Sequence, residues 1–316
     1  MITQSHREAV GDFQLGCSKQ HRSDLPQMKT MLATVDPYAV PLVSLTVAGN
    51  EADDGLYLPV ILELNKTLPL KYQLFVGDSK MGSIENRSGI INLKHYYLTP
   101  LSKKQCSLEQ IDDYLSKKPE KLKILKVTKK DKMGTMKAKA FEITETVNNT
   151  DDTLTWEERR IVAYSPSYAA SQIKVFEKKL TGTQSELDLI FEAKQGRRRP
   201  KTLKETQQVV DKILKENKVT DFITVQITEI KTEKQVRAYG SRPAETRIIV
   251  DFGINYSINQ TAYQKQIDRL GWRVYGCNAP IEKMSTLDAL QCYRNEYRIE
   301  HKFDELLNRI TALMPV

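Results

Sequence analysis

The segment Tyr72-Gln73-Leu74-Phe75-Val76-Gly77-Asp78-Ser79-Lys80-Met81 predicts a short strand that ends just before an aspartate. Residues 81–93 then have the pattern of a short helix, and residues 95–98 that of a second strand. Upstream, residues 40–47 predict another strand and residues 54–66 a helix with apolar residues on one side. Strands and helices therefore alternate over the first hundred residues, which is typical of an α/β sheet with crossover connections.

The pattern changes after about residue 102. Residues 122–128, 138–147 and 154–164 predict strands rich in lysine and threonine, and residues 167–217 predict a long polar helical region. Two further strands are expected at residues 222–230 and 247–254. The α/β pattern returns with a helix at 260–270, a strand at 271–276 and a last helix from Ser285 to about Arg309. Its first residues, Ser285 to Asp288, form a capping-box pattern.

These changes predict three regions. Residues 1–101 form the first part of an α/β core, residues 102–257 form a β-rich and helical insertion, and residues 258–316 complete the core.

Composition narrows the class of protein. With 316 residues and 40% hydrophobic content the chain can bury a sizeable core. No apolar run approaches the roughly 20 residues of a membrane span, and the first residues lack the pattern of a secretory signal. The four cysteines and four histidines are scattered. We therefore expect a cytoplasmic protein with reduced thiols and without a histidine-based metal site.

The net charge of +8 is unevenly distributed. Lysines are concentrated between residues 117 and 132, and Gly196-Arg197-Arg198-Arg199-Pro200-Lys201 forms a second basic cluster. Clusters of this kind suit the phosphate backbone of a nucleic acid. A solvated charged face is an equally good interpretation of either cluster alone.

Near the C-terminus, Tyr293-Arg294-Asn295-Glu296-Tyr297-Arg298-Ile299-Glu300 is predicted to lie in one helix. Two helical turns separate Tyr293 from Glu300, so both would share a face. A glutamate fixed on a helix can bind a metal together with carboxylates of a neighbouring sheet. The simpler interpretations are a solvated glutamate, a packed tyrosine and, for Asp78, the cap of a helix.

Three segments together resemble the DDE transposases of bacterial insertion sequences, specifically the group with a β-rich insertion and a Tyr-x2-Arg-x3-Glu-x6-Lys signature. They are Gly16-Cys17-Ser18-Lys19-Gln20-His21-Arg22-Ser23-Asp24-Leu25-Pro26-Gln27, the region from Gly49 through Asp53-Asp54 to Met81, and residues 293–300. Their order and spacing fit the family over nearly the whole chain.

The resemblance implies an RNase H-like mixed sheet with flanking helices, interrupted by the insertion before the last catalytic helix. It implies three carboxylates that bind two Mg²⁺ ions, with Mn²⁺ as a substitute, for phosphodiester cleavage and strand transfer. Asp78 corresponds to the second carboxylate and Glu300 to the third. Contacts to DNA would come from Tyr293, Arg294, Arg298, Lys80 and Arg22.

The partners that the resemblance implies are double-stranded DNA, at inverted-repeat ends and at the target, and a second copy of the chain in a synaptic homodimer. The expected location is the cytoplasm, in association with the nucleoid.

The sequence also departs from the family. No apolar strand that ends in aspartate precedes Gly16, so the first carboxylate is expected to be absent and the chain truncated at both ends. Glu296 stands where the signature has arginine, and Leu307 where it has lysine. We therefore expect a catalytically incomplete transposase. The alternatives are a non-catalytic DNA-binding remnant and a fragment that lacks a strand and does not fold stably.

Overall fold

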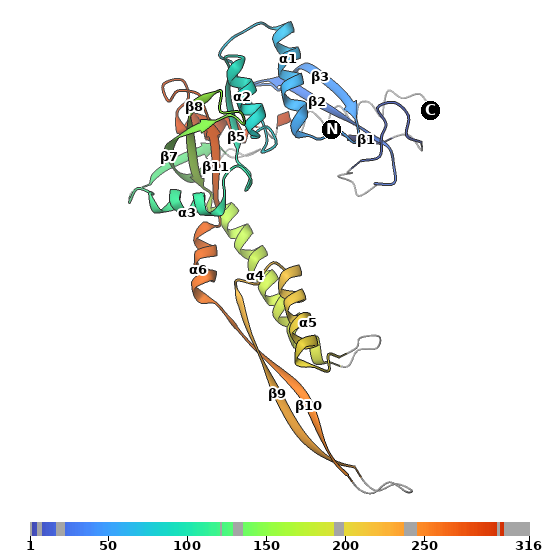
Figure 1. Cartoon of the computed structure of the whole chain (residues 1–316). Helices are drawn as coiled ribbons and strands as arrows, with labels where there is room; N and C mark the ends of the chain where they lie inside the picture. Colours follow the sequence, from blue (N-terminus) through green and yellow to red (C-terminus); the bar gives the residue numbers. More distant parts are fainter. Residues whose placement is uncertain are drawn as a thin grey trace. The chain divides into compact units, whose positions relative to one another are not determined.

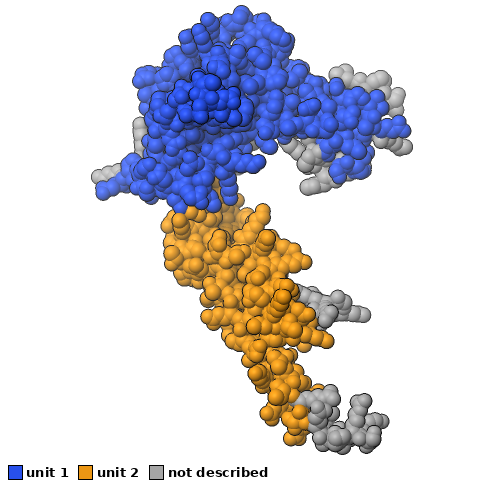
Figure 2. All heavy atoms as spheres, in the orientation of Figure 1, with its two compact units in different colours: residues 1–165, 272–316 blue, residues 166–271 orange. Residues whose placement is uncertain are grey.

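The computed structural model describes residues 2–4, 8–16, 23–120, 122–128, 135–192, 199–236, 245–295 and 298–299. The chain divides into two compact units (Figure 2). Unit 1 comprises Met1–Ser165 and Trp272–Val316, and unit 2 comprises Pro166–Gly271. No described helix is long and apolar enough to cross a membrane.

The main sheet of unit 1 is mixed, which confirms the predicted α/β class (Figure 1). Its strand order is β4 (Leu74–Val76), β5 (Tyr96–Pro100), β11 (Trp272–Cys277), β8 (Thr155–Tyr164), β7 (Thr135–Asn148) and β6 (Lys123–Thr128). β4 and β5 are parallel, and every other neighbouring pair is antiparallel. The β4–α2–β5 crossover is the connection that the sequence pattern predicted.

Three helices of unit 1 begin at serine caps. They are α2 (Ile84–Asn92), α3 (Leu108–Ser116) and α7 (Thr286–Arg294). The side-chain oxygen of Ser285 accepts a hydrogen bond from the Asp288 amide at 3.2 Å, as the sequence predicted. The cap satisfies one of the amides that have no partner within the helix.

A smaller antiparallel sheet contains β1 (Ile2–Gln4), β2 (Gln27–Val35) and β3 (Val40–Ala48), in that order. The short helix η1 (Asp54–Leu56) leads into α1 (Tyr57–Thr67), which contacts both β2 and β3. Val60 and Ile61 are buried side chains of α1. The strand β3 and this helix lie where the sequence predicted them, whereas β2 was not predicted.

Unit 2 contains α4 (Pro166–Asp188), η2 (Leu189–Phe191), α5 (Leu203–Glu216), β9 (Ile223–Val236), β10 (Glu245–Ile258) and α6 (Gln260–Arg269). β9 and β10 form a long antiparallel hairpin (Figure 1). A separate core joins the helices to the base of the hairpin, where Phe176, Leu180, Val210 and Ile223 are buried. Unit 2 therefore has apolar packing of its own.

The structure divides the chain at positions other than 102 and 257. β6, β7 and β8 were expected in the insertion, but they belong to the sheet of unit 1. The reason is that β8 pairs with β11, from Tyr164 opposite Trp272 to Arg159 opposite Cys277. Unit 2 therefore contains residues 166–257 of the predicted insertion, together with residues 258–271, which were predicted to belong to the core.

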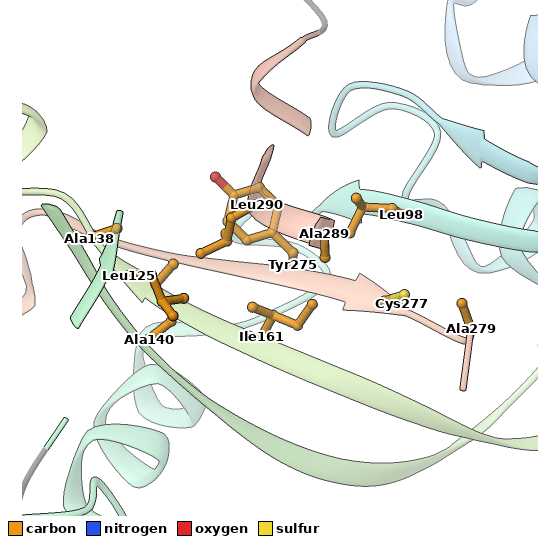
Figure 3. Packing of buried hydrophobic residues seen from close by; sticks show 11 residues of the cluster. Leu98, Leu125, Ala138, Ala140, Ile161, Tyr275, Cys277, Ala279, Ala289 and Leu290 are labelled. Atoms are coloured by element: carbon orange, nitrogen blue, oxygen red, sulfur yellow. The ribbon is translucent and has the colours of Figure 1, made fainter. Parts of the chain in front are cut away.

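The largest apolar cluster of unit 1 lies where α7 packs on the main sheet (Figure 3). Ala289 and Leu290 of α7 contact a layer that includes Tyr275, Cys277 and Ile161. All five side chains are buried. Burial of a large apolar side chain contributes about 1.5–3 kcal/mol, so this contact fixes α7 on the sheet.

A buried carboxylate, Glu158 of β8, lies at the centre of an ionic cluster. Nη1 of Arg87 is 2.6 and 2.7 Å from its two oxygens, and Nη1 of Arg160 is 2.7 Å from Oε2. The hydroxyl of Tyr97 donates to Oε1 at 2.5 Å and accepts from Nε1 of Trp156 at 2.8 Å. Every ionised group of the cluster is paired, as the low dielectric of a protein interior requires.

The cluster extends from Arg160 to the edge of the sheet. Nε of Arg160 donates to Oε2 of Glu145 at 3.1 Å, and the hydroxyl of Tyr114 donates to Oε1 at 2.6 Å. On the β11 side, a Cβ atom at Gly276 would lie 2.6 Å from Oε1 of Glu158. Glycine at this position therefore leaves the space that the carboxylate occupies.

We predict that Glu158→Gln destabilises the protein by about 3–5 kcal/mol, because two buried arginines lose their shared counter-charge. Urea unfolding followed by circular dichroism measures this loss. Glu157→Gln is the matched control, since Glu157 is the exposed neighbour on the same strand. The control should change stability by less than about 0.5 kcal/mol. Equal effects of the two substitutions would contradict the role assigned to Glu158.

A second prediction concerns alkaline pH. Burial raises the pKa of the Cys106 and Cys277 thiols from 9.0 to about 11. The unfolded chain therefore releases these protons at lower pH than the folded chain, and the free energy of unfolding should fall between pH 9 and 11. Cys277→Ala should make this fall less steep. Urea titrations at several pH values measure how steeply the free energy of unfolding falls with pH in the wild-type protein and in Cys277→Ala. The tyrosines contribute equally to both slopes, so the difference reports on Cys277.

Candidate functional site

The predicted site begins at the C-terminal end of β4. Asp78 follows this strand by two residues, and its side chain is exposed. Gly77 lies between them, where an added Cβ atom would approach Sδ of Met81 to 2.7 Å and Cε1 of Tyr57 to 3.2 Å. The missing side chain therefore lets Tyr57 and Met81 close around the turn that carries Asp78.

The turn from Asp78 to Gly82 is held by side chains from several elements. Four of its main-chain carbonyls accept a side-chain hydrogen bond of 2.7–3.3 Å: Asp78 from Thr99, Ser79 from Gln105, Lys80 from Asn86 and Gly82 from Arg87. Buried Asn86 also donates to the carbonyl of Asp54 at 2.9 Å. This links η1, which leads into α1, to the turn and fixes the main chain of Asp78 relative to both sheets of unit 1.

The carboxylate of Asp78 is oriented through one oxygen. Its Oδ1 accepts hydrogen bonds from the Tyr57 hydroxyl and from the Lys80 amide, both at 2.7 Å. Oδ2 accepts no hydrogen bond from any residue that the structure describes. A fixed carboxylate with one oxygen toward solvent is suited to bind a cation or a proton donor.

The segment that leads to α7 is fixed by a second ion pair. Arg159 of β8 forms two hydrogen bonds with Glu142 of β7, at 2.7 and 2.9 Å. Its Nη1 also donates to the carbonyls of Ala279 and Met284, both at 2.8 Å. The hydroxyl of Thr286, the first residue of α7, donates to Glu142 at 2.7 Å. The start of α7 is therefore bound to the main sheet.

The end of α7 differs from the prediction. The helix ends at Arg294 with Asn295 as its C-cap, and residues 298–299 are again helical. Among the described residues, the predicted helix is interrupted at Asn295, whose amide donates to the Cys292 carbonyl at 3.0 Å. Because α7 ends at Arg294, it does not place Tyr293 and Glu300 on one helical face.

The structure describes four of the residues predicted to contact DNA. Lys80 is exposed beside Asp78. The Tyr293 ring lies edge-on to Tyr275 at 5.0 Å, which agrees with the packing interpretation. The Arg294 guanidinium is half-buried, and this burial lowers its pKa. Arg298 donates a hydrogen bond to the Pro37 carbonyl at 2.6 Å. Basic side chains are therefore present on both segments of the predicted site.

Glu300 and Arg22 lie outside the described residues. The described neighbour of Glu300, Ile299, lines the same groove as Val76, which is two residues before Asp78. Cys292 and Asn295 line this groove as well. The two predicted segments thus approach each other in the folded chain.

Sequence reasoning missed the residues that orient Asp78. Tyr57 lies in a helix that was predicted for its apolar pattern, and Asn86 and Gln105 are isolated polar residues without a recognisable motif. Two signals pointed to this region: the end of the strand before Asp78, and the segment up to Met81 that carries the family resemblance. The sequence has no signal for a hydrogen bond between residues 57 and 78.

The described residues do not complete the site for divalent cations that the family resemblance implies. Asp78 is the one predicted carboxylate that they include, and they contain no group of three acidic, histidine or cysteine side chains arranged to bind a metal. Mg²⁺ usually binds to one or two carboxylates together with substrate phosphates and water molecules. Asp78 alone provides only part of such a ligand set.

A comparison of the chain with models of known protein families finds no match. A search among characterised proteins finds no significant match either.

We predict that Asn86→Ala loosens the Asp78 turn and destabilises the protein by about 1–3 kcal/mol, because buried main-chain carbonyls lose a donor. Hydrogen exchange should become faster at the amides of residues 80–83. Glu85→Ala is the control, since Glu85 is exposed on the same helix. Unchanged exchange in Asn86→Ala would show that the turn does not depend on this side chain.

Proposed function

We propose that this chain is a DDE transposase-family protein of an insertion sequence, with an RNase H-like core in unit 1. Its ancestral reaction is phosphodiester cleavage and strand transfer at terminal inverted repeats. Asp78 is the carboxylate that we assign to this site, and Glu300 is its proposed partner.

One observation carries the proposal: the segments before the two proposed carboxylates line a common groove. Val76 ends β4 just before Asp78, and Ile299 directly precedes Glu300. These segments are far apart in the sequence, so folding alone brings them together. A site that acts on a phosphodiester needs acidic groups from such separate elements at one place.

The orientation of Asp78 supports the same proposal. Side chains of β5, of α2 and of the loop before α3 hold the turn. Tyr57 and the Lys80 amide hold one carboxylate oxygen. A positioned carboxylate loses little freedom when a ligand binds, whereas a mobile one must first be ordered. Exposed Lys80 adds a positive charge where a phosphate would bind.

Double-stranded DNA is the proposed partner, with a second copy of the chain in a synaptic homodimer and a location at the nucleoid. The net charge of +8 and the basic clusters favour DNA through the release of counterions. The same features fit the alternative proposal, a non-catalytic DNA-binding remnant.

The test measures binding of a fluorescent duplex DNA of random sequence, by anisotropy at several salt concentrations and with or without Mn²⁺. We expect the affinity to fall steeply with salt. We also expect Mn²⁺ to strengthen binding by about tenfold, equivalent to 1.4 kcal/mol, because Asp78 and its proposed partner Glu300 would hold the ion and its charge would attract phosphate. Asp78→Asn should remove the effect of Mn²⁺ and preserve binding without the ion. Asp113→Asn is the control, since Asp113 is an exposed acid on α3.

Nicking of supercoiled plasmid in the presence of Mg²⁺ or Mn²⁺ separates the two proposals. Because the chain is expected to be catalytically incomplete, we expect Mn²⁺ to affect binding without nicking. Nicking by the wild-type chain that Asp78→Asn abolishes would support the transposase site and contradict this incompleteness. DNA binding without nicking and without an effect of Mn²⁺ would favour the non-catalytic remnant. No binding at low salt would contradict both.

A further inference from the structure

The hairpin of unit 2 extends beyond the helices that cover its base (Figure 1). At the base, Ile223, Val225 and Ile254 belong to the core of unit 2. Farther along, residues 229–235 of β9 pair with residues 246–252 of β10. We call these two stretches the distal ribbon. Its described side chains are exposed, with the exception of Phe252.

The distal ribbon consists of two strands with open outer edges. β9 and β10 form a sheet of their own and pair only with each other among the described strands. A two-stranded hairpin with both faces in water is marginally stable, and a third strand or a packed face is needed to stabilise it. The main-chain groups on each outer edge are available to pair with another strand.

The two outer edges differ in composition. Within the ribbon, β9 has charged side chains at four of its seven positions: Glu229, Lys231, Glu233 and Lys234. Charged residues of this kind protect an edge strand from pairing. β10 instead has Ile248, Ile249 and Val250 in succession, and these side chains are 64%, 40% and 41% exposed. The edge of β10 is therefore the one that suits a partner strand.

The sequence around Ile249 is complementary to itself. An arginine stands two residues before Ile249 and an aspartate two residues after it, in the segment Arg247-Ile248-Ile249-Val250-Asp251. Two copies of this segment can lie antiparallel with the two Ile249 residues opposite each other. Position 247 of each copy is then opposite position 251 of the other, and directly opposite residues share a face of the sheet. Opposite charges therefore meet at both ends of the apolar segment.

The charges of the hairpin itself favour such a neighbour. The register of β9 and β10 places Arg247 opposite Lys234, and like charges at directly opposite positions destabilise a strand pair. Asp251 is exposed and forms no ion pair with a residue that the structure describes. An aspartate from a second copy, on the open side of β10, would offset the positive charge at position 247.

We propose that β10 pairs antiparallel with β10 of a second copy of this chain, centred on Ile249. The product is a four-stranded sheet with the order β9-β10-β10-β9, in which residues 246–252 of both copies pair over roughly 23 Å of strand. A two-fold axis passes between the two Ile249 residues. The same surface is thus used by both copies, and the contact closes as a dimer.

This pairing provides a surface for the homodimer of the proposed function, but it rests on unit 2 alone. DNA is a poorer partner for the distal ribbon, because its three acidic residues balance its three basic residues. Phosphate binding needs an excess of positive charge, and DNA would not pair with the main-chain groups of β10. A strand of unrelated sequence lacks the charges that match β10 at both ends.

The test measures the dimerisation of the full chain by sedimentation velocity at several concentrations, without DNA. We expect an equilibrium between monomer and dimer. Asp251→Arg brings two arginines together at each end of the pairing, and Arg247→Asp brings two aspartates together. Each substitution should weaken the dimer at least about tenfold. An equimolar mixture of the two variants should form a heterodimer, because every opposite pair then joins an arginine to an aspartate.

Glu233→Arg is the matched control, since Glu233 is an exposed acid on the other strand of the ribbon. It should change the dimer affinity by less than about twofold, and circular dichroism checks that all variants fold.

The register has a test of its own. Ile249→Cys should form a disulfide-linked dimer under mild oxidation, because position 249 lies opposite itself in the second copy. Ile230→Cys is the control, since Ile230 is a similarly exposed residue of β9. The wild-type chain gives the background from the native cysteines.

A chain that stays monomeric at every concentration would overturn the proposal. So would a mixture of Asp251→Arg and Arg247→Asp that recovers no dimer, or a dimer that neither substitution weakens. These outcomes leave the proposed function open, because DNA binding and its dependence on Asp78 are measured separately. Conversely, a dimer that does not bind DNA would contradict the proposed function and leave the pairing of β10 in place.

Discussion

The buried carboxylate of Glu158 is the interaction on which the rest of unit 1 depends. It forms ion pairs with Arg87 and Arg160, which come from a helix and a strand, and it accepts a hydrogen bond from the hydroxyl of Tyr97 on another strand. Removal of one partner would leave a charge in a low-dielectric interior, at a cost larger than most single contacts provide. The cluster therefore sets the position of α2 on the main sheet, and Gly276 provides the space for it.

The same cluster determines how rigidly Asp78 is held. Arg87 reaches from Glu158 to the Gly82 carbonyl, so the ionic core and the turn share one side chain. Asn86, the neighbouring residue, connects the turn to η1, which precedes α1. A carboxylate on such a turn is preorganised, whichever ligand it binds. This supports the proposal that Asp78 belongs to a site that acts on phosphodiesters. It also gives a reason why buried side chains hold the turn of an exposed aspartate.

Folding brings the two segments of the proposed site to one groove, because Val76 and Ile299 both line it and Asp78 follows Val76 by two residues. Among the described residues, Tyr57 of α1 and Asn86 of α2 connect the Asp78 turn to the helical segment that packs on β2 and β3. The geometry of the site therefore depends on contacts between elements that are far apart in the sequence.

Local patterns in the sequence determined the strands β3, β7 and β8, the helix after Asp54, the cap at Ser285 and the place of Asp78 after a strand, because each depends on nearby residues alone. They did not identify β2, whose apolar residues are interrupted by Lys29 and Thr30. Only the tertiary structure decided that β6–β8 join β11 and that Tyr57, Asn86 and Arg87 support the Asp78 turn. Strand neighbours and side-chain partners are set by contacts between distant residues, and no local periodicity encodes them.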